Sequence, residues 1–201
     1  MIGIINYGLG NVKAILNLYN YHSIKAKLIS TKKDFDLIDR LILPGVGSFD
    51  NAINLFNSSG MREETEKLVI GKKIPILGIC VGMQMLGNNS EEGKQKGLSW
   101  INGNIKKINF SNKKLPLPHL GWNKITTTKN SKILKGLNNH YFYFLHSYFF
   151  SENENNLQIA TFDYQSKFTC AVNKDNIYGV QFHPEKSHSS GEELLINFSK
   201  I

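Results

Sequence analysis

The stretch Ile76-Leu77-Gly78-Ile79-Cys80-Val81-Gly82-Met83-Gln84 combines a strand pattern, a tight turn and the start of a helix. Its apolar first half predicts a buried strand over residues 74–79, and residues 81–86 predict the opening of a helix. Glycines two positions to either side of Cys80 allow neighbouring elements to approach a strained turn. This is the nucleophile-elbow pattern with cysteine in place of serine. Unpaired N–H groups and the positive dipole end of the helix favour a thiolate.

A buried structural role is the alternative for Cys80, because free cysteines usually behave as small apolar residues. Cys170 illustrates that role: it lies in Phe168-Thr169-Cys170-Ala171-Val172, which has no glycine pair and no following helix. We therefore expect Cys170 to be a core residue. The elbow pattern taken alone leaves both interpretations of Cys80 open.

A second pattern ends a predicted strand with His183-Pro184-Glu185. Proline biases His183 toward extended backbone, in which side chains two positions apart point the same way. His183 could then take a proton from Cys80 while Glu185 orients the imidazole. A local hydrogen bond is the simpler role for such a histidine, and a metal site with His188 would need further converging ligands. We expect no metal.

The third pattern is the glycine-rich turn Leu43-Pro44-Gly45-Val46-Gly47-Ser48-Phe49, between a predicted strand and a predicted helix. Next to an elbow, backbone N–H groups at Val46 and Gly47, together with that of Val81, can form an oxyanion hole. A phosphate cradle is the rival, since helix N-termini bind anions. Neither the Walker pattern nor Gly-x-Gly-x-x-Gly is present, which weakens this rival.

The first half of the chain alternates short apolar runs with amphipathic stretches, the pattern of parallel strands joined by helices. We expect strands at 2–6, 26–29, 41–43 and 74–79, and helices at 11–22, 49–56, 61–70 and 81–86. The second half predicts β-rich segments at 105–110, 124–127, 141–148, 157–163, 168–173 and 177–182, then a helix at 192–200. The predicted fold is one α/β domain over residues 1–201, a three-layer sandwich. It has a mostly parallel central sheet, helices on both faces and an antiparallel extension in its C-terminal half.

Composition narrows the classes of partner. The net charge is +8 and the pI near 9.4, but the basic residues are spread along the chain and include only Arg40 and Arg62 as arginines. A lysine- and asparagine-rich composition explains this charge better than nucleic-acid binding does. Two cysteines in apolar runs indicate a reducing compartment, and neither a signal peptide nor a membrane-spanning run is evident. We expect a cytoplasmic protein without membrane or nucleic-acid partners.

With these motifs in order, the sequence resembles the class I, triad-type glutamine amidotransferases, and within them the glutaminase subunits of imidazole glycerol phosphate synthases. The resemblance runs essentially end to end. The shared motifs lie at residues 6–11, 44–49, 78–84, 117–123, 143–148 and 179–187.

The resemblance implies a site. Cys80 would be the nucleophile that forms a glutamyl thioester, His183 the acid and base, and Glu185 its orienting partner. Gly47, Gln84, His146, Ser147 and Tyr148 would hold L-glutamine. No cofactor is implied.

The resemblance also implies a partner, a (β/α)₈ barrel cyclase bound as a heterodimer. It would receive ammonia through an internal channel and form imidazole glycerol phosphate and AICAR in histidine biosynthesis. Asn11, Trp122 and Lys186 correspond to family positions that face the barrel. Trp122 taken alone would more often be a core residue. The glutaminase would be nearly silent until the partner binds its own ligand.

Three departures from the family pattern leave alternatives open: Asn6 replaces a common acid, Val81 replaces leucine, and His188 follows Lys186-Ser187. Such a histidine is associated with paralogues that supply ammonia for amidination of a surface or flagellar sugar. A catalytically silent regulatory subunit is a second alternative. A peptidase or ester hydrolase with the same elbow is a third, although the His183-Pro184-Glu185 spacing and Gln84 argue against it.

Overall fold

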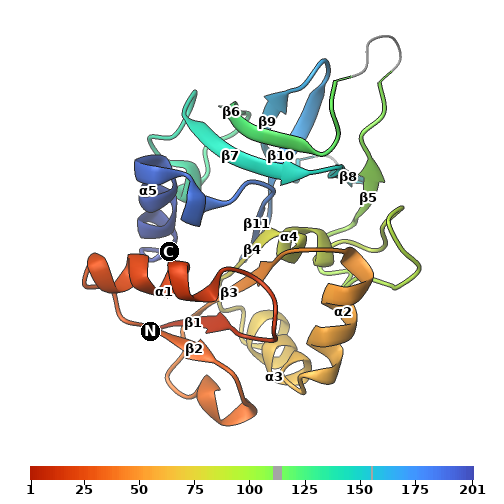
Figure 1. Cartoon of the computed structure of the whole chain (residues 1–201). Helices are drawn as coiled ribbons and strands as arrows, with labels where there is room; N and C mark the ends of the chain where they lie inside the picture. Colours follow the sequence, from red (N-terminus) through yellow and green to blue (C-terminus); the bar gives the residue numbers. More distant parts are fainter. Residues whose placement is uncertain (111–114, 155) are drawn as a thin grey trace.

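The first half of the chain builds the parallel part of a large sheet (Figure 1). A computed structural model describes residues 1–110, 115–154 and 156–201. Within them, nine strands form one sheet in the order β2-β1-β3-β4-β11-β10-β9-β6-β7. Parallel pairing joins β2 (Ala26–Ile29), β1 (Ile2–Ile5), β3 (Arg40–Gly45), β4 (Ile76–Cys80) and β11 (Ile177–Val180). Every residue of β1, β4 and β11 is buried, as expected for strands covered on both faces.

Helices cover both faces of this parallel part (Figure 1). Helices α1 (Val12–Tyr21) and α5 (His188–Phe198) lie on one side, where the Tyr19 hydroxyl donates to the carbonyl of Leu195 at 3.1 Å. The other side carries α2 (Phe49–Ser58) and α3 (Arg62–Glu66), which continues into a π-helical turn at Lys67–Gly71. The buried residues of α2 recur at helical spacing, at 49, 52, 53 and 56.

The second half of the chain extends the sheet with antiparallel strands. These are β10 (Lys167–Lys174), β9 (Gln158–Asp163), β6 (His119–Thr127) and β7 (Tyr141–His146). A separate two-stranded sheet pairs β5 (Gly103–Lys107) with β8 (Tyr148–Glu152). The predicted α/β class, with its large sheet flanked by helices and its antiparallel extension, is confirmed.

Several predicted boundaries were wrong, and three of them bear on the site and its surroundings. The segment 141–148 divides between two sheets at Ser147, where the ring of His146 donates from Nδ1 to the carbonyl of Tyr148 at 2.7 Å and fixes the change of direction. Strand β6 begins at His119 rather than at the predicted residue 124, and the apolar side chains of this added segment, Leu120 and Trp122, face outward instead of into the core. Helix α5 begins at His188.

A cluster of phenylalanines links the end of β11, just before His183, to the antiparallel extension. The ring of Phe182 lies 4.1 Å from that of Phe142 between centroids, and Phe144 lies 4.8 Å from Phe162. All four side chains are buried. Nowhere in the described part of the chain is a helix both long and apolar enough to span a bilayer.

Candidate active site

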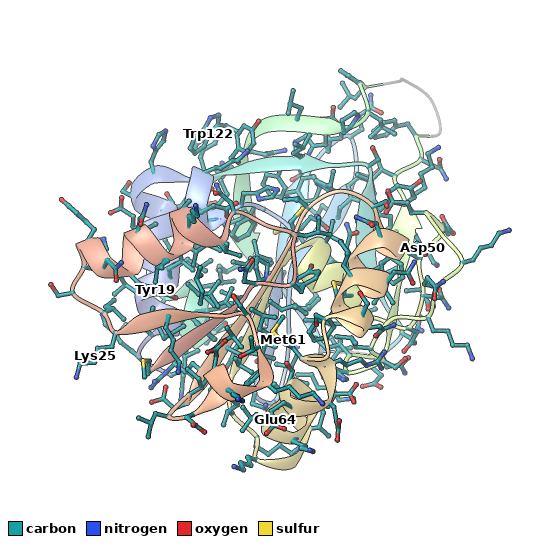
Figure 2. The ribbon with its side chains drawn as sticks, turned by 60° about the horizontal axis from the view of Figure 1, so that its bottom comes forward. Tyr19, Lys25, Asp50, Met61, Glu64 and Trp122 are labelled. Atoms are coloured by element: carbon teal, nitrogen blue, oxygen red, sulfur yellow. The ribbon has the colours of Figure 1, made fainter. Side chains whose placement is uncertain are left out.

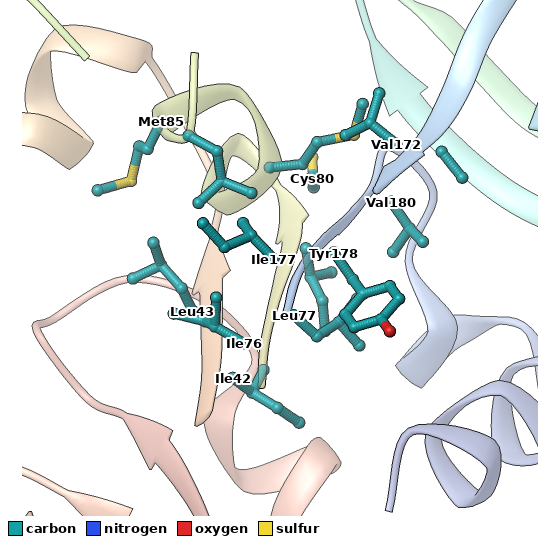
Figure 3. Packing of buried hydrophobic residues seen from close by; sticks show 14 of the residues in the cluster. Ile42, Leu43, Ile76, Leu77, Cys80, Met85, Val172, Ile177, Tyr178 and Val180 are labelled. Atoms are coloured by element: carbon teal, nitrogen blue, oxygen red, sulfur yellow. The ribbon is translucent and has the colours of Figure 1, made fainter. Parts of the chain in front are cut away.

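Cys80 lies at the carboxyl end of β4, beyond the aliphatic residues of the parallel sheet (Figure 3). Its backbone has φ 54° and ψ −114°, a conformation that L-residues rarely adopt. Such strain costs about 1–3 kcal/mol and is typical of functional sites. A side chain at Gly82 would place its Cβ 1.9 Å from the carbonyl oxygen of Leu43, and one at Gly78 would lie 2.7 Å from that of Gly82. Only glycine fits on either side of the elbow.

The helix that follows Cys80 is too short to carry a strong dipole. Helix α4 (Val81–Met85) has five residues, so its dipole gives the sulfur less support than a full helix would. Val81 is its first residue, and its N–H therefore has no partner within the helix. This N–H is free to face a substrate oxygen.

His183 and Glu185 form a buried pair. The imidazole donates from Nδ1 to Oε1 of Glu185 at 3.0 Å, and the two side chains are 4% and 2% exposed. His183 itself has the predicted extended backbone, with φ −101° and ψ 96°, but the extended segment ends there because Pro184–Lys186 forms a 3₁₀ turn. This turn, rather than strand alternation, brings the carboxylate back onto the ring.

Charge at the site favours the protonated imidazole. Burial alone would lower the pKa of His183. The Cys80 sulfur and the Glu185 carboxylate together have the opposite and larger effect, so the pKa is raised to about 10. Cys80 acts on the ring both as a hydrogen-bond partner and as a charge. Both side chains line one pocket, where the raised pKa of His183 suits the ring to hold a proton beside the sulfur.

A pocket of about 290 Å³ opens over the elbow. This is the size range of a site for one small ligand. Register explains its composition: Gly45 pairs with Cys80 across β3 and β4, so Val46 and Gly47 follow directly beside the sulfur. The predicted residues that line it are Val46, Gly47, Cys80, Val81, Gln84, His146, Ser147, Tyr148, His183 and Lys186.

Within this lining, His146 has both ring nitrogens occupied. Its Nδ1 donates to the carbonyl of Tyr148, and its Nε2 lies 3.2 Å from Nδ1 of His119. Burial lowers the pKa of His146 to about 3 and that of His119 to about 4, so both rings are neutral. The predicted glutamine contact of His146 stays a prediction, and its ring bonds favour a role in shaping the wall of the pocket.

Sequence reasoning missed two polar residues of the site. Glu92 lines the pocket, and its Oε2 accepts from the backbone N–H of Phe49 at 2.8 Å. Gln181 is fully buried, and its Nε2 donates to the sulfur of Cys80 at 3.7 Å. Glu92 falls in a polar loop without a recognisable motif. The available signal for Gln181 was a polar residue in an apolar strand pattern, two positions before His183.

The residues predicted to face a partner lie outside the centre of the pocket. Asn11 is exposed before α1, and Lys186 lies at the pocket with its Nζ 5.6 Å from the centre of the Tyr143 ring. Trp122 is 46% exposed and stacks on His188 with ring centroids 5.1 Å apart. Figure 2 shows Trp122 at the surface, at the end of the molecule opposite Glu64. Among residues 1–110, 115–154 and 156–201, no cluster of three or more acidic, histidine or cysteine side chains could hold a metal ion.

The sequence and the fold match a known class. The family model described as glutamine amidotransferase class-I matches residues 3–201. A solved structure entitled crystal structure of glutamine amidotransferase superposes with a TM-score of 0.76 at 16% identity, covering 100% of this chain and 99% of that one. The chain belongs to the class-I glutamine amidotransferases, and the predicted class of enzyme is confirmed.

Relatives of higher sequence identity identify the family within this class. The chain is 48% identical over 204 residues to the imidazole glycerol phosphate synthase subunit HisH of Leptospira interrogans, with 100% of both covered. It is 45% identical to the subunit named HisH 2 of Methanococcus maripaludis, covering 100% of this chain and 99% of that protein. Within the class, the chain belongs to the HisH family.

Proposed function

We propose that this chain, acting as one amidotransferase domain over residues 1–201, is the glutaminase subunit of an imidazole glycerol phosphate synthase. It hydrolyses L-glutamine to glutamate and ammonia in the cytoplasm, without a cofactor, and serves histidine biosynthesis. The observation that carries the proposal is the convergence of Cys80 and His183 at one pocket, with Glu185 bonded to the imidazole. The identity to HisH subunits over the full chain supports the pathway.

The chemistry follows from the positions of these groups. The Cys80 thiolate attacks the side-chain amide carbon, while the N–H of Val81 and the loop at Val46 and Gly47 stabilise the oxyanion. The imidazolium of His183 gives its proton to the departing nitrogen, so that ammonia leaves and a thioester forms. His183 then removes a proton from water, which attacks the thioester and releases glutamate. Glu185 keeps the ring oriented throughout.

Substrate binding uses the pocket wall. Gly47, Gln84, Ser147 and Tyr148 line it close to the elbow, with His146 behind. Glu92 adds a carboxylate, one oxygen of which is held by the N–H of Phe49. Its other oxygen suits the α-ammonium group of glutamine. A charged partner of this kind favours the free amino acid over a glutamine within a protein chain.

An exposed apolar face supports a partner beside the pocket. On the edge pair β6 and β7, Leu120 faces Leu145 and Trp122 faces Tyr143 across the strands, and Leu120, Trp122 and Leu145 are exposed. We assign this face, with Asn11 and Lys186, to the (β/α)₈ barrel cyclase of a heterodimer. Ammonia in bulk water at neutral pH is mostly protonated, and a channel into the partner would keep it nucleophilic.

Substitution of the nucleophile tests the proposal in the complex with the barrel subunit. Cys80→Ala is expected to abolish glutamate formation from glutamine. The matched control is Cys170→Ala, which alters a buried cysteine away from the pocket and should retain activity. Glutaminase activity that survives in the Cys80→Ala complex would end the thioester mechanism. Absence of a Cys80 adduct with a glutamine-mimicking electrophile, in a complex that also lacks turnover, would favour a silent regulatory subunit.

A second function shares this chemistry and differs in the acceptor of the ammonia. The stacking of His188 on Trp122 places a departure from the family pattern on the proposed partner face. This favours a paralogue that supplies ammonia for amidination of a sugar. Purification of the chain from its native cells, with identification of the bound barrel subunit and its substrate, separates the two.

A further inference from the structure

Gln181 bridges two residues of the site. Its Nε2 donates to the sulfur of Cys80 at 3.7 Å, and its Oε1 accepts from Nε2 of Gln84 at 3.1 Å. Its backbone N–H donates to the carbonyl of Cys170 at 2.8 Å, which fixes the residue against β10. The side chain is fully buried, so no water competes for these bonds. A buried amide that is satisfied in this way has a defined orientation.

The bond from Gln84 decides which end of the Gln181 amide faces the sulfur. Because Gln84 donates its NH₂ to the oxygen of Gln181, the NH₂ of Gln181 points toward Cys80. The sulfur therefore meets a hydrogen-bond donor. A donor stabilises a thiolate and gives no comparable support to a neutral thiol.

The sulfur has few other donors. Cys80 is 4% exposed, and a buried anion is costly unless it is hydrogen-bonded. His183, held by Glu185, lines the same pocket and supplies a charged group beside the sulfur. The Tyr7 hydroxyl donates to the carbonyl of Pro44 at 2.7 Å rather than to the sulfur. Among the described residues, the neutral side-chain donor that reaches the sulfur is Gln181.

We propose that Gln181 stabilises the thiolate of Cys80 by donating an amide N–H to the sulfur, with Gln84 holding that amide in the donating orientation. The inference rests on the proposed role of Cys80 as the nucleophile. It gives Gln84 a second task besides lining the substrate pocket. It also supplies the support that the short helix α4 cannot give.

Alkylation of Cys80 by iodoacetamide, measured against pH, tests this in the isolated full chain. The thiolate forms a bond to the methylene carbon and iodide leaves, so the rate follows the fraction of thiolate. Peptide mass spectrometry reads Cys80 separately from Cys170. Gln181→Met removes the donor and is expected to raise the midpoint of the rate profile by about one pH unit. This shift corresponds to alkylation that is about tenfold slower below the midpoint.

The matched control is Gln158→Met on β9. Gln158 is a half-buried glutamine whose Nε2 donates to the hydroxyl of Thr169 at 2.8 Å rather than to the sulfur. Its midpoint should equal that of the unaltered chain. A purely structural role of Gln181 would lower thermal stability and leave the midpoint in place.

A second variant, Gln181→Glu, keeps the shape of the side chain and an oxygen for Gln84 but turns a carboxylate toward the sulfur. Its midpoint should rise further than that of Gln181→Met, and it decides the matter if the methionine variant does not fold. An unchanged or lower midpoint would overturn the role of Gln181. If Cys80 of the unaltered chain reacts no faster than buried Cys170, the assignment of the nucleophile fails instead.

Discussion

The strained backbone at Cys80 can be measured by removing its side chain in two steps. Cys80→Ala retains the Cβ that makes φ 54° unfavourable, and Cys80→Gly removes it. Comparing these two variants cancels the loss of the sulfur. The same step from alanine to glycine at Ala52, a buried position in the middle of α2 with ordinary helical backbone, provides the reference.

The magnitude follows from three contributions. Deletion of a buried methyl group costs about 0.8 kcal/mol, and glycine costs about 1 kcal/mol more in a regular element. Ala52→Gly should therefore lower the free energy of unfolding by roughly 2 kcal/mol. At position 80 similar losses are offset by the release of about 1–3 kcal/mol of strain. The free energy of unfolding of Cys80→Gly should thus lie between about 1 kcal/mol below and about 1 kcal/mol above that of Cys80→Ala.

Urea denaturation of the four proteins at one pH, followed by circular dichroism, gives the two differences. The quantity of interest is the difference between the step at position 80 and the step at position 52, which isolates the strain. If Cys80→Gly falls below Cys80→Ala by as much as Ala52→Gly falls below the unaltered chain, the elbow stores no strain. The argument that the elbow holds the sulfur in a preorganised position would then fail.

Three further predictions concern the charges of the site. Glu185→Gln leaves the shape of the pair but removes the anion that orients His183, so kcat of the complex should fall on the order of 10⁴-fold with little change in KM. Glu92→Gln should raise KM for glutamine about tenfold at nearly unchanged kcat, because the carboxylate is proposed to bind the ammonium group in ground and transition states alike; a fall in kcat alone would contradict that role. The pKa of His183 is raised to about 10, so the folded chain holds a proton that the unfolded chain loses above about pH 6.5. Up to about pH 8.5, where a free thiol ionises, this extra proton is offset by the proton that the proposed Cys80 thiolate has lost, so the free energy of unfolding should decrease mainly as the pH rises from about 8.5 to 10. A His183→Asn variant that shows the same slope would remove this residue as the cause.

Sequence patterns predicted the parts of the site that depend on local geometry. Glycines at 78 and 82 define the elbow, because the close backbone approaches there exclude any side chain. The glycine-rich turn at 45–47 was likewise evident, since its residues continue a buried strand into a helix. Both predictions need only the neighbouring residues along the chain.

Long-range contacts could not be predicted in the same way. The ring of His119 lies against that of Phe162 and bonds to His146, but nothing near it in sequence indicates burial. Glu92 reaches the N–H of Phe49 from a loop distant in sequence. The 3₁₀ turn after His183 was missed because the residue before a proline is ordinarily extended, and the turn begins only at Pro184.

Sheet order explains why the residues of the site meet. Strands β3, β4 and β11 are adjacent and parallel, with Gly45 paired to Cys80 and Val180 paired to Ile79. The carboxyl ends of all three strands therefore open at one edge, which is where α/β sheets bind ligands. The proposed oxyanion loop follows β3, the nucleophile ends β4, and Gln181 and His183 follow β11. Insertion of β11 next to β4, rather than at the outer edge beside β2, is the step that places acid–base chemistry beside the thiol, and neither strand carries that choice in its own sequence.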